Sequence, residues 1–374
     1  AFFEQRLAFA NTATQPQTLF FSVSGDYTNF TAGVKDDSAL IYTIGSNQVN
    51  VIRYLTSSRV LLVGTSGGEF AVKSTNEGPI TPLTTQIKQQ AKYGSADIQP
   101  LVIGSTALFV QREQRKVREL VYNFDLDSYI APDMTLLAEH ITNGKIKEMA
   151  YQQEPNNVVW CVLENGKLVA MTYRREEDVV AWHEHLLGGT FTDGATTYDY
   201  GFVESIASIS SSDRTEEEVY VCVKRTIDGS NVRHIERLKP IDFGDDIEDA
   251  FYVDAGLTYD GPSTTPSGVG FSSTATTISL DDASGFATSG KIRVTNPTYF
   301  EIITYTGKSG NSLTGCTRGA DGTEAKAHDT NAVVTQFITS ITGLDHLEGE
   351  TVSVLADEAA RPGKIVLSSR IPPA

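Results

Sequence analysis

The feature of this chain that most restricts its fold is a repetition of short apolar segments, each of about six to nine residues, separated by turn residues. Four of these segments lie between Ser38 and Lys73, and Gly, Ser or Asn residues bound them: SALIYTI, QVNVIRYL, RVLLVGT and GEFAVK. Four strands in so short a span are typical of an antiparallel meander, the unit that forms one blade of a β-propeller. The sequence therefore predicts an all-β fold.

The same rhythm continues along the chain. A further group contains IQPLVIG, ALFVQRE and KVRELVYNF; a second clean set contains KIKEMAYQQ, NVVWCVLE, KLVAMTYRR and VVAWHEHL; a third contains VESIASIS, EEVYVCVKR and VRHIERLK. Asn165-Gly166 and Asp228-Gly229-Ser230 are expected hairpin turns. No residue signature repeats with the rhythm, so a β-sandwich pair is the alternative to a propeller-like core. Helix is expected only in TTQIKQQAKYG and in DMTLLAEHITNG, the latter with Asp133 as N-cap.

A change of composition divides the chain. The segment Gly261 to Thr277 is poor in charge and rich in Ser, Thr, Gly and Pro, which indicates a linker. A self-contained run of short strands follows it, and ITGLDHLEGETVSVLAD then resumes the earlier pattern. We therefore expect a propeller-like β core over 1–258, a linker and inserted small β-module over 259–340, and a return to the β core over 341–374. An insertion of this size costs little entropy where its ends lie close together.

Charge and cysteine content exclude several classes of protein. The 374 residues include 47 acidic and 30 basic side chains, for a net charge of −17, and such a surface repels phosphate backbones. Sequence-specific binding of nucleic acid is not expected. No apolar run approaches the roughly 20 residues that span a bilayer. The three cysteines, Cys161, Cys222 and Cys316, are far apart and are interpreted as reduced thiols without a disulfide or a metal.

The segment AWHEHLLGG is the strongest candidate for chemistry. In a strand, His183 and His185 project to one face, as metal ligands on a strand do. The alternative is that both are polar members of an alternating strand beside Trp182. No further ligand with suitable spacing lies nearby, so we expect no metal site. No nucleophile elbow, nucleotide fingerprint or placed Cys and His pair occurs, and we expect neither a cofactor nor enzyme activity.

The segment SGDYTNF, Ser24 to Phe30, has the composition of a hairpin turn. Gly25 allows the turn, and the Asp26 side chain can accept hydrogen bonds from backbone amides. Tyr27 and Phe30 are expected to anchor the loop. This turn faintly resembles the Asp-box of sialidase propellers, but it occurs once and without the usual tryptophan.

Several long stretches, in order, resemble the tail nozzle, or tail tubular protein B-like, family of short-tailed bacteriophages and prophages. The resemblance covers roughly Ala1 to Tyr259 and Ile341 to Asp357, and the following stretches carry it: AFFEQRLAFANTATQPQTLFFSVSGDYTNF, QVNVIRYL, LLVGTSGGEFAV, YGSADIQPLVIGSTALFVQR, KVRELVYNFDLDSYIAPDMTLLAEHI, the run IKEMAYQQ to WHEHLLGG, and ITGLDHLEGETVSVLAD. The small β-module departs from the family pattern and is similar to modules in assorted phage structural proteins.

This resemblance implies a structural virion protein. Several copies would form a homo-oligomeric ring below the tail adaptor protein, as a tube or nozzle through which double-stranded DNA is ejected without specific binding. The protein would be assembled in the bacterial host cytoplasm and located in the virion tail. The family has no catalytic residues, and its recurring positions would be blade turns and packing anchors: Gly25, Asp26, Tyr27, Trp182, His183, Gly343, Asp345 and His346.

Two expectations follow from the charge and from the fold class. An acidic or neutral lining would let DNA pass with little friction, because contact with it releases no counterions.

The alternative function is a receptor-binding or glycan-cleaving β-propeller of a phage tail, in which the module and the Trp182-His183 pair line a carbohydrate site. A host surface receptor would then be the partner.

Overall fold

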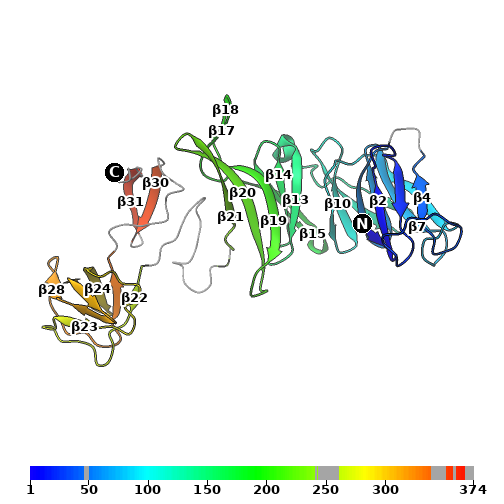
Figure 1. Cartoon of the computed structure of the whole chain (residues 1–374). Coiled ribbons are helices and arrows are strands. Elements are labelled where there is room, and N and C mark those ends of the chain that lie inside the picture. Colours follow the sequence, from blue (N-terminus) through cyan, green and yellow to red (C-terminus); the bar gives the residue numbers. More distant parts are fainter. Residues whose placement is uncertain (46–49, 241, 243–260, 338–350, 357–358, 367–374) are drawn as a thin grey trace, which may run out of the picture. The chain divides into compact units, whose positions relative to one another are not determined.

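The fold is described from a computed structural model (Figure 1), over residues 1–45, 50–240, 242, 261–337, 351–356 and 359–366, with side chains up to Phe337. The chain forms two compact units, Ala1–Ala255 and Gly256–Ala374. Strand accounts for 52% of the structure and helix for 2%. All the sheets are antiparallel, so the expected all-β, propeller-like class is confirmed.

The first unit begins with three four-stranded sheets. Sheet 1 contains β1 (Phe2–Phe3), β2 (Arg6–Ala10), β3 (Thr18–Phe21) and β4 (Leu40–Thr43). Sheet 2 contains β5 (Ile52–Ser57), β6 (Leu61–Thr65), β7 (Gly68–Ser74) and β8 (Thr85–Ala91). Sheet 3 contains β9 (Leu101–Ile103), β10 (Thr106–Val110), β11 (Val117–Asn123) and β12 (Ser128–Ile130).

Two further sheets complete this unit. Sheet 4 contains β13 (Ile146–Gln152), β14 (Val158–Leu163), β15 (Leu168–Arg174) and β16 (Val179–His185). Sheet 5 has three strands, β19 (Phe202–Ser210), β20 (Glu217–Ile227) and β21 (Ser230–Arg237). The hairpin of β17 (Phe191–Asp193) and β18 (Thr196–Tyr198) lies between them in the chain. Each sheet is a meander, because each strand pairs with the one before it.

The five sheets stack face on face in chain order. Strand β14 shows why: all six of its residues are buried, and alternate side chains enter two different cores. Val159 and Cys161 pack toward sheet 3, whereas Trp160 and Val162 pack toward sheet 5. A strand covered on both faces is expected to be a continuous apolar run instead of an alternating one. Comparable cores join sheets 1 and 2, and sheets 2 and 3.

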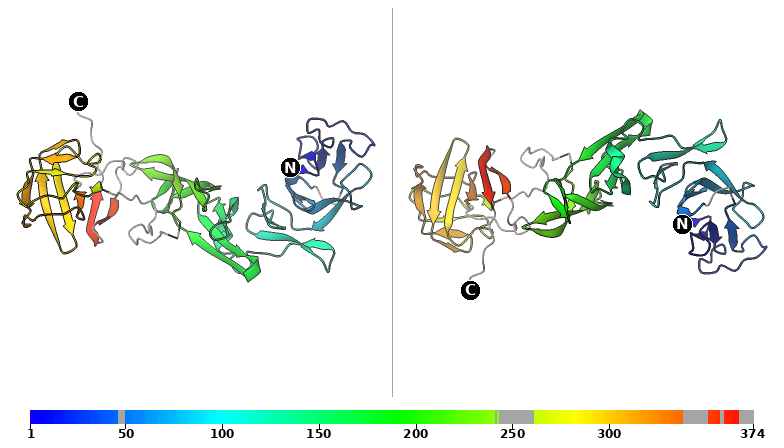
Figure 2. Two further views of the ribbon diagram at one scale, coloured as in Figure 1. Left: turned by 90° about the horizontal axis from the view of Figure 1, so that it is seen from below. Right: turned by 90° about the horizontal axis from the view of Figure 1, so that it is seen from above.

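Sheets 1 and 5 are the two ends of this row. Figures 1 and 2 show β2 and β4 at one end of the first unit and β19 to β21 at the other. Among the described residues, no cluster of buried apolar side chains joins sheet 1 to sheet 5. In the part of the first unit that the structure describes, each terminal sheet therefore keeps one face that none of the other four stacked sheets covers.

Three local predictions were wrong. TTQIKQQAKYG is not a helix, because most of it forms β8, which pairs with β7. DMTLLAEHITNG is not an α-helix either, because it contains turns and only one short 3-10 helix, η1 (Ile141–Gly144). Another short 3-10 helix, η2 (Arg175–Glu177), follows β15 outside this segment. The four segments within Ser38 to Lys73 do not form one blade. The first of them, β4, pairs with β3 in sheet 1, and β8 completes sheet 2.

The second unit contains a small β-fold built from two sheets. One sheet has the order β22-β29-β24-β25-β28 and the other β23-β27-β26. Their bounds are β22 (Ser263–Thr264), β23 (Thr277–Ser279), β24 (Gly290–Asn296), β25 (Tyr299–Tyr305), β26 (Gly307–Ser309), β27 (Ser312–Thr314), β28 (Thr317–Ala320) and β29 (Val333–Gln336). They enclose one apolar core that includes Ile278, Ile292, Ile303 and Leu313.

A separate hairpin of β30 (Thr351–Ala356) and β31 (Ala359–Val366) ends the described part of this unit. The predicted return of 341–374 to the β core stays a prediction, since much of that segment lies outside the described residues. In the part of the chain that the structure describes, no helix has the length and apolar character needed to cross a membrane.

Candidate functional site

The turn at SGDYTNF lies in the connection between β3 and β4. Gly25 has a φ of +74°, a conformation that favours glycine. One carboxylate oxygen of Asp26 accepts hydrogen bonds from the Thr28 amide at 3.4 Å and from its hydroxyl at 3.1 Å. This side chain therefore holds the turn from within, as Asp side chains commonly do in turns.

The two aromatic residues of the turn lie on the outer side of sheet 1. The Tyr27 ring meets Phe2 edge-on, with 5.1 Å between ring centroids, and Phe30 lies 5.6 Å from Phe9. Such edge-on and tilted pairs are favourable arrangements for aromatic rings. Tyr27 and Phe30 of the turn and Phe2 and Phe9 of the sheet therefore form adjoining aromatic pairs on the same side of sheet 1.

The strand register defines this surface. Phe9 pairs with Phe20, and Phe20 pairs with Ile41, so the three side chains form one row on one side of sheet 1. The next row on the opposite side, with Ala8 and Phe21, is buried against sheet 2. We call the uncovered side the aromatic face, and its members are Phe2, Leu7, Phe9, Phe20, Tyr27, Phe30 and Ile41.

The aromatic face is open to solvent. Phe2 is 62% exposed, Phe9 51% and Ile41 50%. Scattered apolar side chains are normal on protein surfaces, but a contiguous group of large ones marks an interaction site. In this group, exposed Phe2 and Phe9 each contact an aromatic ring of the turn.

Sheet 5 also has a side that no other stacked sheet covers among the described residues, and we call it the terminal face. Cross-strand pairs place Tyr220 beside Arg237, Cys222 beside Ile235 and Lys224 beside Arg233 on this side. Ile235 is 81% exposed, and Ile209 of β19 is 52% exposed. The opposite side, with Val221 and Val223, is buried against sheet 4.

Two carboxylates organise the charges of the terminal face. Glu204 forms ion pairs with Arg233 and Lys224, and the Arg233 hydrogen bond is the main cause that lowers the Glu204 pKa to about 2. Glu218 accepts hydrogen bonds from Arg237 and from the hydroxyl of Tyr220. The cations of the terminal face are therefore paired with carboxylates, Lys224 and Arg233 with Glu204 and Arg237 with Glu218.

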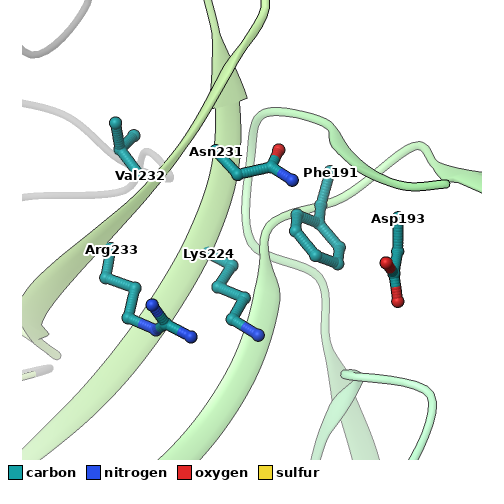
Figure 3. A pocket seen from close by; sticks show the side chains of 6 residues that line it. All are labelled: Phe191, Asp193, Lys224, Asn231, Val232 and Arg233. Carbon is teal, nitrogen blue, oxygen red and sulfur yellow. The ribbon is translucent and has the colours of Figure 1, made fainter.

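A small cleft opens beside this face (Figure 3). It has a volume of about 180 Å³ and is lined by Phe191, Asp193, Lys224, Asn231, Val232 and Arg233. The Lys224 ammonium lies 5.5 Å from the centroid of the Phe191 ring. Both cations of the cleft are paired with Glu204, so they already have a carboxylate partner.

The predicted pair His183 and His185 lies on the edge strand β16. Nδ1 of His183 and Nε2 of His185 are 2.7 Å apart, so one ring donates a hydrogen bond to the other. The rings pack against Trp160, and burial lowers the pKa of both histidines, that of His185 to about 4. No cluster of three potential metal ligands occurs among the described residues.

Trp182 points to the other side of the same strand. Its indole Nε1 donates a hydrogen bond to the carbonyl of Met134 at 2.8 Å, and its ring packs on the core between sheets 3 and 4. The structure therefore separates Trp182 from His183, and the two do not line a common pocket. The other expected anchors, Gly343, Asp345 and His346, lie outside the described residues.

The second unit holds a buried polar cluster that sequence reasoning missed. Glu301 accepts hydrogen bonds from Nη2 of Arg318 at 2.6 Å and from His328 Nε2 at 2.8 Å, as well as from the amides of Gly319 and Lys326. Although burial opposes ionisation, these donors lower the Glu301 pKa to about 2. Glu301, Arg318 and His328 lie far apart in sequence, so no local sequence pattern predicts that they form a cluster.

An open cleft adjoins this cluster. Its volume is about 430 Å³, and its lining includes Phe271, Tyr299 and His328. The Phe271 and Tyr299 rings lie 5.1 Å and 5.5 Å from the His328 ring. Two aromatic rings therefore line the cleft, next to the buried ion pair of Glu301 and Arg318.

Comparisons with known proteins do not identify a family for this chain. No protein-family model matches it. No curated protein matches it in sequence. Three solved structures are similar at low TM-scores: an auxiliary nutrient binding protein from Bacteroides thetaiotaomicron, a luciferin-regenerating enzyme, and an exo-beta-1,3-galactanase from Phanerochaete chrysosporium.

The nutrient binding protein has 8% identity and a TM-score of 0.29, and the match covers 62% of this chain and 56% of that protein. The luciferin-regenerating enzyme has 11% identity and a TM-score of 0.25, with coverages of 63% and 87%. The galactanase has 10% identity and a TM-score of 0.27, with coverages of 88% and 95%. Similarity at this level carries no functional argument.

Proposed function

We propose that this chain is a structural protein of a bacteriophage tail, a subunit of the tube or nozzle through which DNA leaves, and that it acts through contacts instead of catalysis. The observation that carries the proposal is the aromatic face of sheet 1. Its rings are ordered by contacts with one another, yet Phe2, Phe9 and Ile41 are at least half exposed. A contiguous apolar surface of this kind is typical of a protein–protein interface.

The architecture supports the same function. All five stacked sheets fall within the 1–259 region that resembles the tail nozzle family. A row of stacked sheets has two different ends, and a subunit with two different contact surfaces is suited to a ring. The proposed partners are further copies of the chain and the tail adaptor protein, and the proposed location is the virion tail.

The charge of the chain supports a passive role toward DNA. A net charge of −17 disfavours lasting contact with phosphates, as a conduit for DNA requires. In this proposal, acidic or neutral side chains line the tube. An assembled ring with a basic lining would contradict that part of the proposal.

Native mass spectrometry of the protein with its tail adaptor tests the function. A defined, ring-sized assembly on the adaptor is expected. Failure to join the adaptor under any condition in which the adaptor itself forms rings would reject the tail-tube role.

A second candidate, a receptor-binding tail protein, is favoured by one observation in the second unit. The open cleft with Phe271 and Tyr299 presents aromatic rings beside polar groups, a combination common in ligand sites. Binding of host surface glycans by the full chain, lost in Tyr299→Ala and kept in Phe300→Ala, would support this candidate. Release of reducing sugar during the same incubation would extend it to glycan cleavage.

A further inference from the structure

We propose that the aromatic face of one copy is covered by the terminal face of a second copy, so that the first units associate head to tail through sheets 1 and 5. This inference rests on the proposed function and deepens it, because it names the two surfaces of the subunit contact. The occupant of the aromatic face is thus another molecule of the same chain.

The first argument is the packing mode inside the unit. Four successive contacts are all made by one sheet lying face on face against the next. At the last of them, Trp160 and Val162 of sheet 4 meet Val203 and Val221 of sheet 5. A sheet from a second copy that covers the aromatic face would continue this same stacking without a new kind of contact.

The second argument is the position of the two uncovered faces. They belong to the two ends of the row, and no apolar core of the described residues joins them within the chain. Two different surfaces that bind each other on separate copies form a heterologous contact. Repetition of such a contact generates a ring or a filament, whereas a contact between two aromatic faces would stop at a dimer.

The third argument is chemical fit. The terminal face offers Ile209 and Ile235, both more than half exposed, to the rings of the aromatic face. Its arginines, Arg233 and Arg237, flank Ile235 in the strand. Arginine stacks readily on aromatic rings, and both residue types are enriched in interface centres.

Charge does not oppose this pairing. The terminal face carries the cations Lys224, Arg233 and Arg237 against Glu204 and Glu218, and Asp193 lines the adjoining cleft, so this region is balanced on a chain whose net charge is −17. In the connection 22–39 beside the aromatic face, three acidic residues stand against Lys35, and Arg6 donates hydrogen bonds to carbonyl groups of this connection. A balanced surface can approach an acidic margin without the repulsion expected between two strongly acidic surfaces.

A mixing experiment on the full chain tests the inference. Ile41→Asp blocks the aromatic face and leaves the terminal face intact, whereas Ile235→Asp does the reverse. Leu137→Asp is the matched control, because Leu137 is 94% exposed and lies in the connection between sheets 3 and 4. Native mass spectrometry at about 50 µM, a concentration that largely populates contacts with a Kd of about 1 µM or tighter, gives the distribution of oligomers. Far-UV circular dichroism verifies that each variant is folded.

We expect oligomers for the wild type and for Leu137→Asp, and at least about tenfold less oligomer for each face variant alone, as for the loss of an interface hot spot. An equimolar mixture of the two face variants should form heterodimers and nothing larger, because each pair retains one intact contact. A monomeric wild type, face variants that still assemble, or a mixture that stays monomeric would overturn the inference.

These outcomes are separate from those of the proposed function. If the face variants still assemble on the adaptor as the wild type does, the head-to-tail contact is wrong and the tail-tube role stands. If the mixture forms heterodimers but no variant or wild-type protein joins the adaptor, the contact is right and the tail-tube role is rejected.

Discussion

The hydroxyl of Tyr173 on β15 donates a hydrogen bond to Oε1 of Glu119 on β11, 3.1 Å away, and so links sheet 3 to sheet 4. Nε of Arg175 donates to the same oxygen at 3.1 Å. Glu119 is buried, and burial together with the Glu119 charge raises the pKa of Tyr173. The boundary between these sheets therefore contains a buried carboxylate that Tyr173 and Arg175 hold by hydrogen bonds.

Removal of this hydroxyl should destabilise the first unit. We expect Tyr173→Phe to lower the free energy of unfolding by about 1.5–3 kcal/mol, the usual contribution of a hydrogen bond to a charged group. Urea unfolding followed by tryptophan fluorescence measures the loss, because Trp160 and Trp182 lie in sheet 4. Tyr27→Phe is the control, since Tyr27 is 44% exposed whereas Tyr173 is buried; an equal loss in both variants would contradict the role of the link.

The hairpin turn between β14 and β15 should tolerate no side chain at Gly166. Gly166 has a φ of +81°, and a Cβ atom there would overlap the Phe202 ring. We expect Gly166→Ala to lower the melting temperature more than Gly194→Ala does. Gly194 has a similar positive φ, +59°, but open space around it, so only the backbone cost of roughly 1–2 kcal/mol applies. Thermal unfolding that shows equal losses for the two variants would contradict the steric argument.

The buried cluster of the second unit should make that unit sensitive to acid. The Glu301 pKa is about 2, well below its ordinary value of 4.5, so Glu301 contributes stability above pH 4.5 that is lost as the pH falls toward 2. Burial also lowers the pKa of His328, which acts in the same direction below pH 6.5. We expect the melting temperature of this unit to fall steadily between pH 6 and pH 2.

Glu301→Gln isolates the contribution of the carboxylate. It leaves Arg318 buried without its charge partner, and the expected loss at pH 7 is about 3 kcal/mol or more, as for a broken buried ion pair. The variant should also lose much of the pH dependence below pH 4.5. Glu324→Gln, at an exposed position, is the control; a Glu301→Gln protein that keeps the wild-type acid profile would show that other groups set it.

The histidine pair should titrate at unusually low pH. Burial, together with the neighbouring His183, lowers the His185 pKa to about 4, so both rings are neutral at pH 7. In His183→Ala we expect the His185 pKa to rise toward 6.5, because the neighbouring charge is removed and the site becomes more hydrated. NMR titration of the ring protons measures the shift, and an unchanged or lower pKa would contradict this origin.

Local sequence patterns predicted most of the strands but not all of their partners. The segments that became β13 to β16 were recognised because each alternates or is apolar throughout, and Asn165-Gly166 marks the turn. TTQIKQQAKYG contains good helix formers, yet it forms β8, since pairing with β7 supplies its backbone hydrogen bonds. The propensity of a short segment is easily overridden by an available strand edge.

The candidate site was only partly visible in the sequence. Asp26, Tyr27 and Phe30 were expected in a turn, and the turn lies as described, but nothing in the sequence showed that Phe9, Phe20 and Ile41 continue its aromatic surface. Their common row depends on the register of β2, β3 and β4. The pairing of Glu301 with Arg318 and His328 likewise joins strands and loops that are distant in the chain.

The sequence by itself determined that the chain forms short antiparallel strands joined by tight turns, because side-chain alternation and turn residues act over a few neighbouring positions. Only the tertiary structure decided which strands share a sheet and which sheet faces are left uncovered. Sheet membership depends on hydrogen bonds between strands. Exposure depends on what lies beyond each face: alternate apolar side chains of β14 are all buried, whereas in β2 Ala8 is buried and Phe9, the next residue, is exposed.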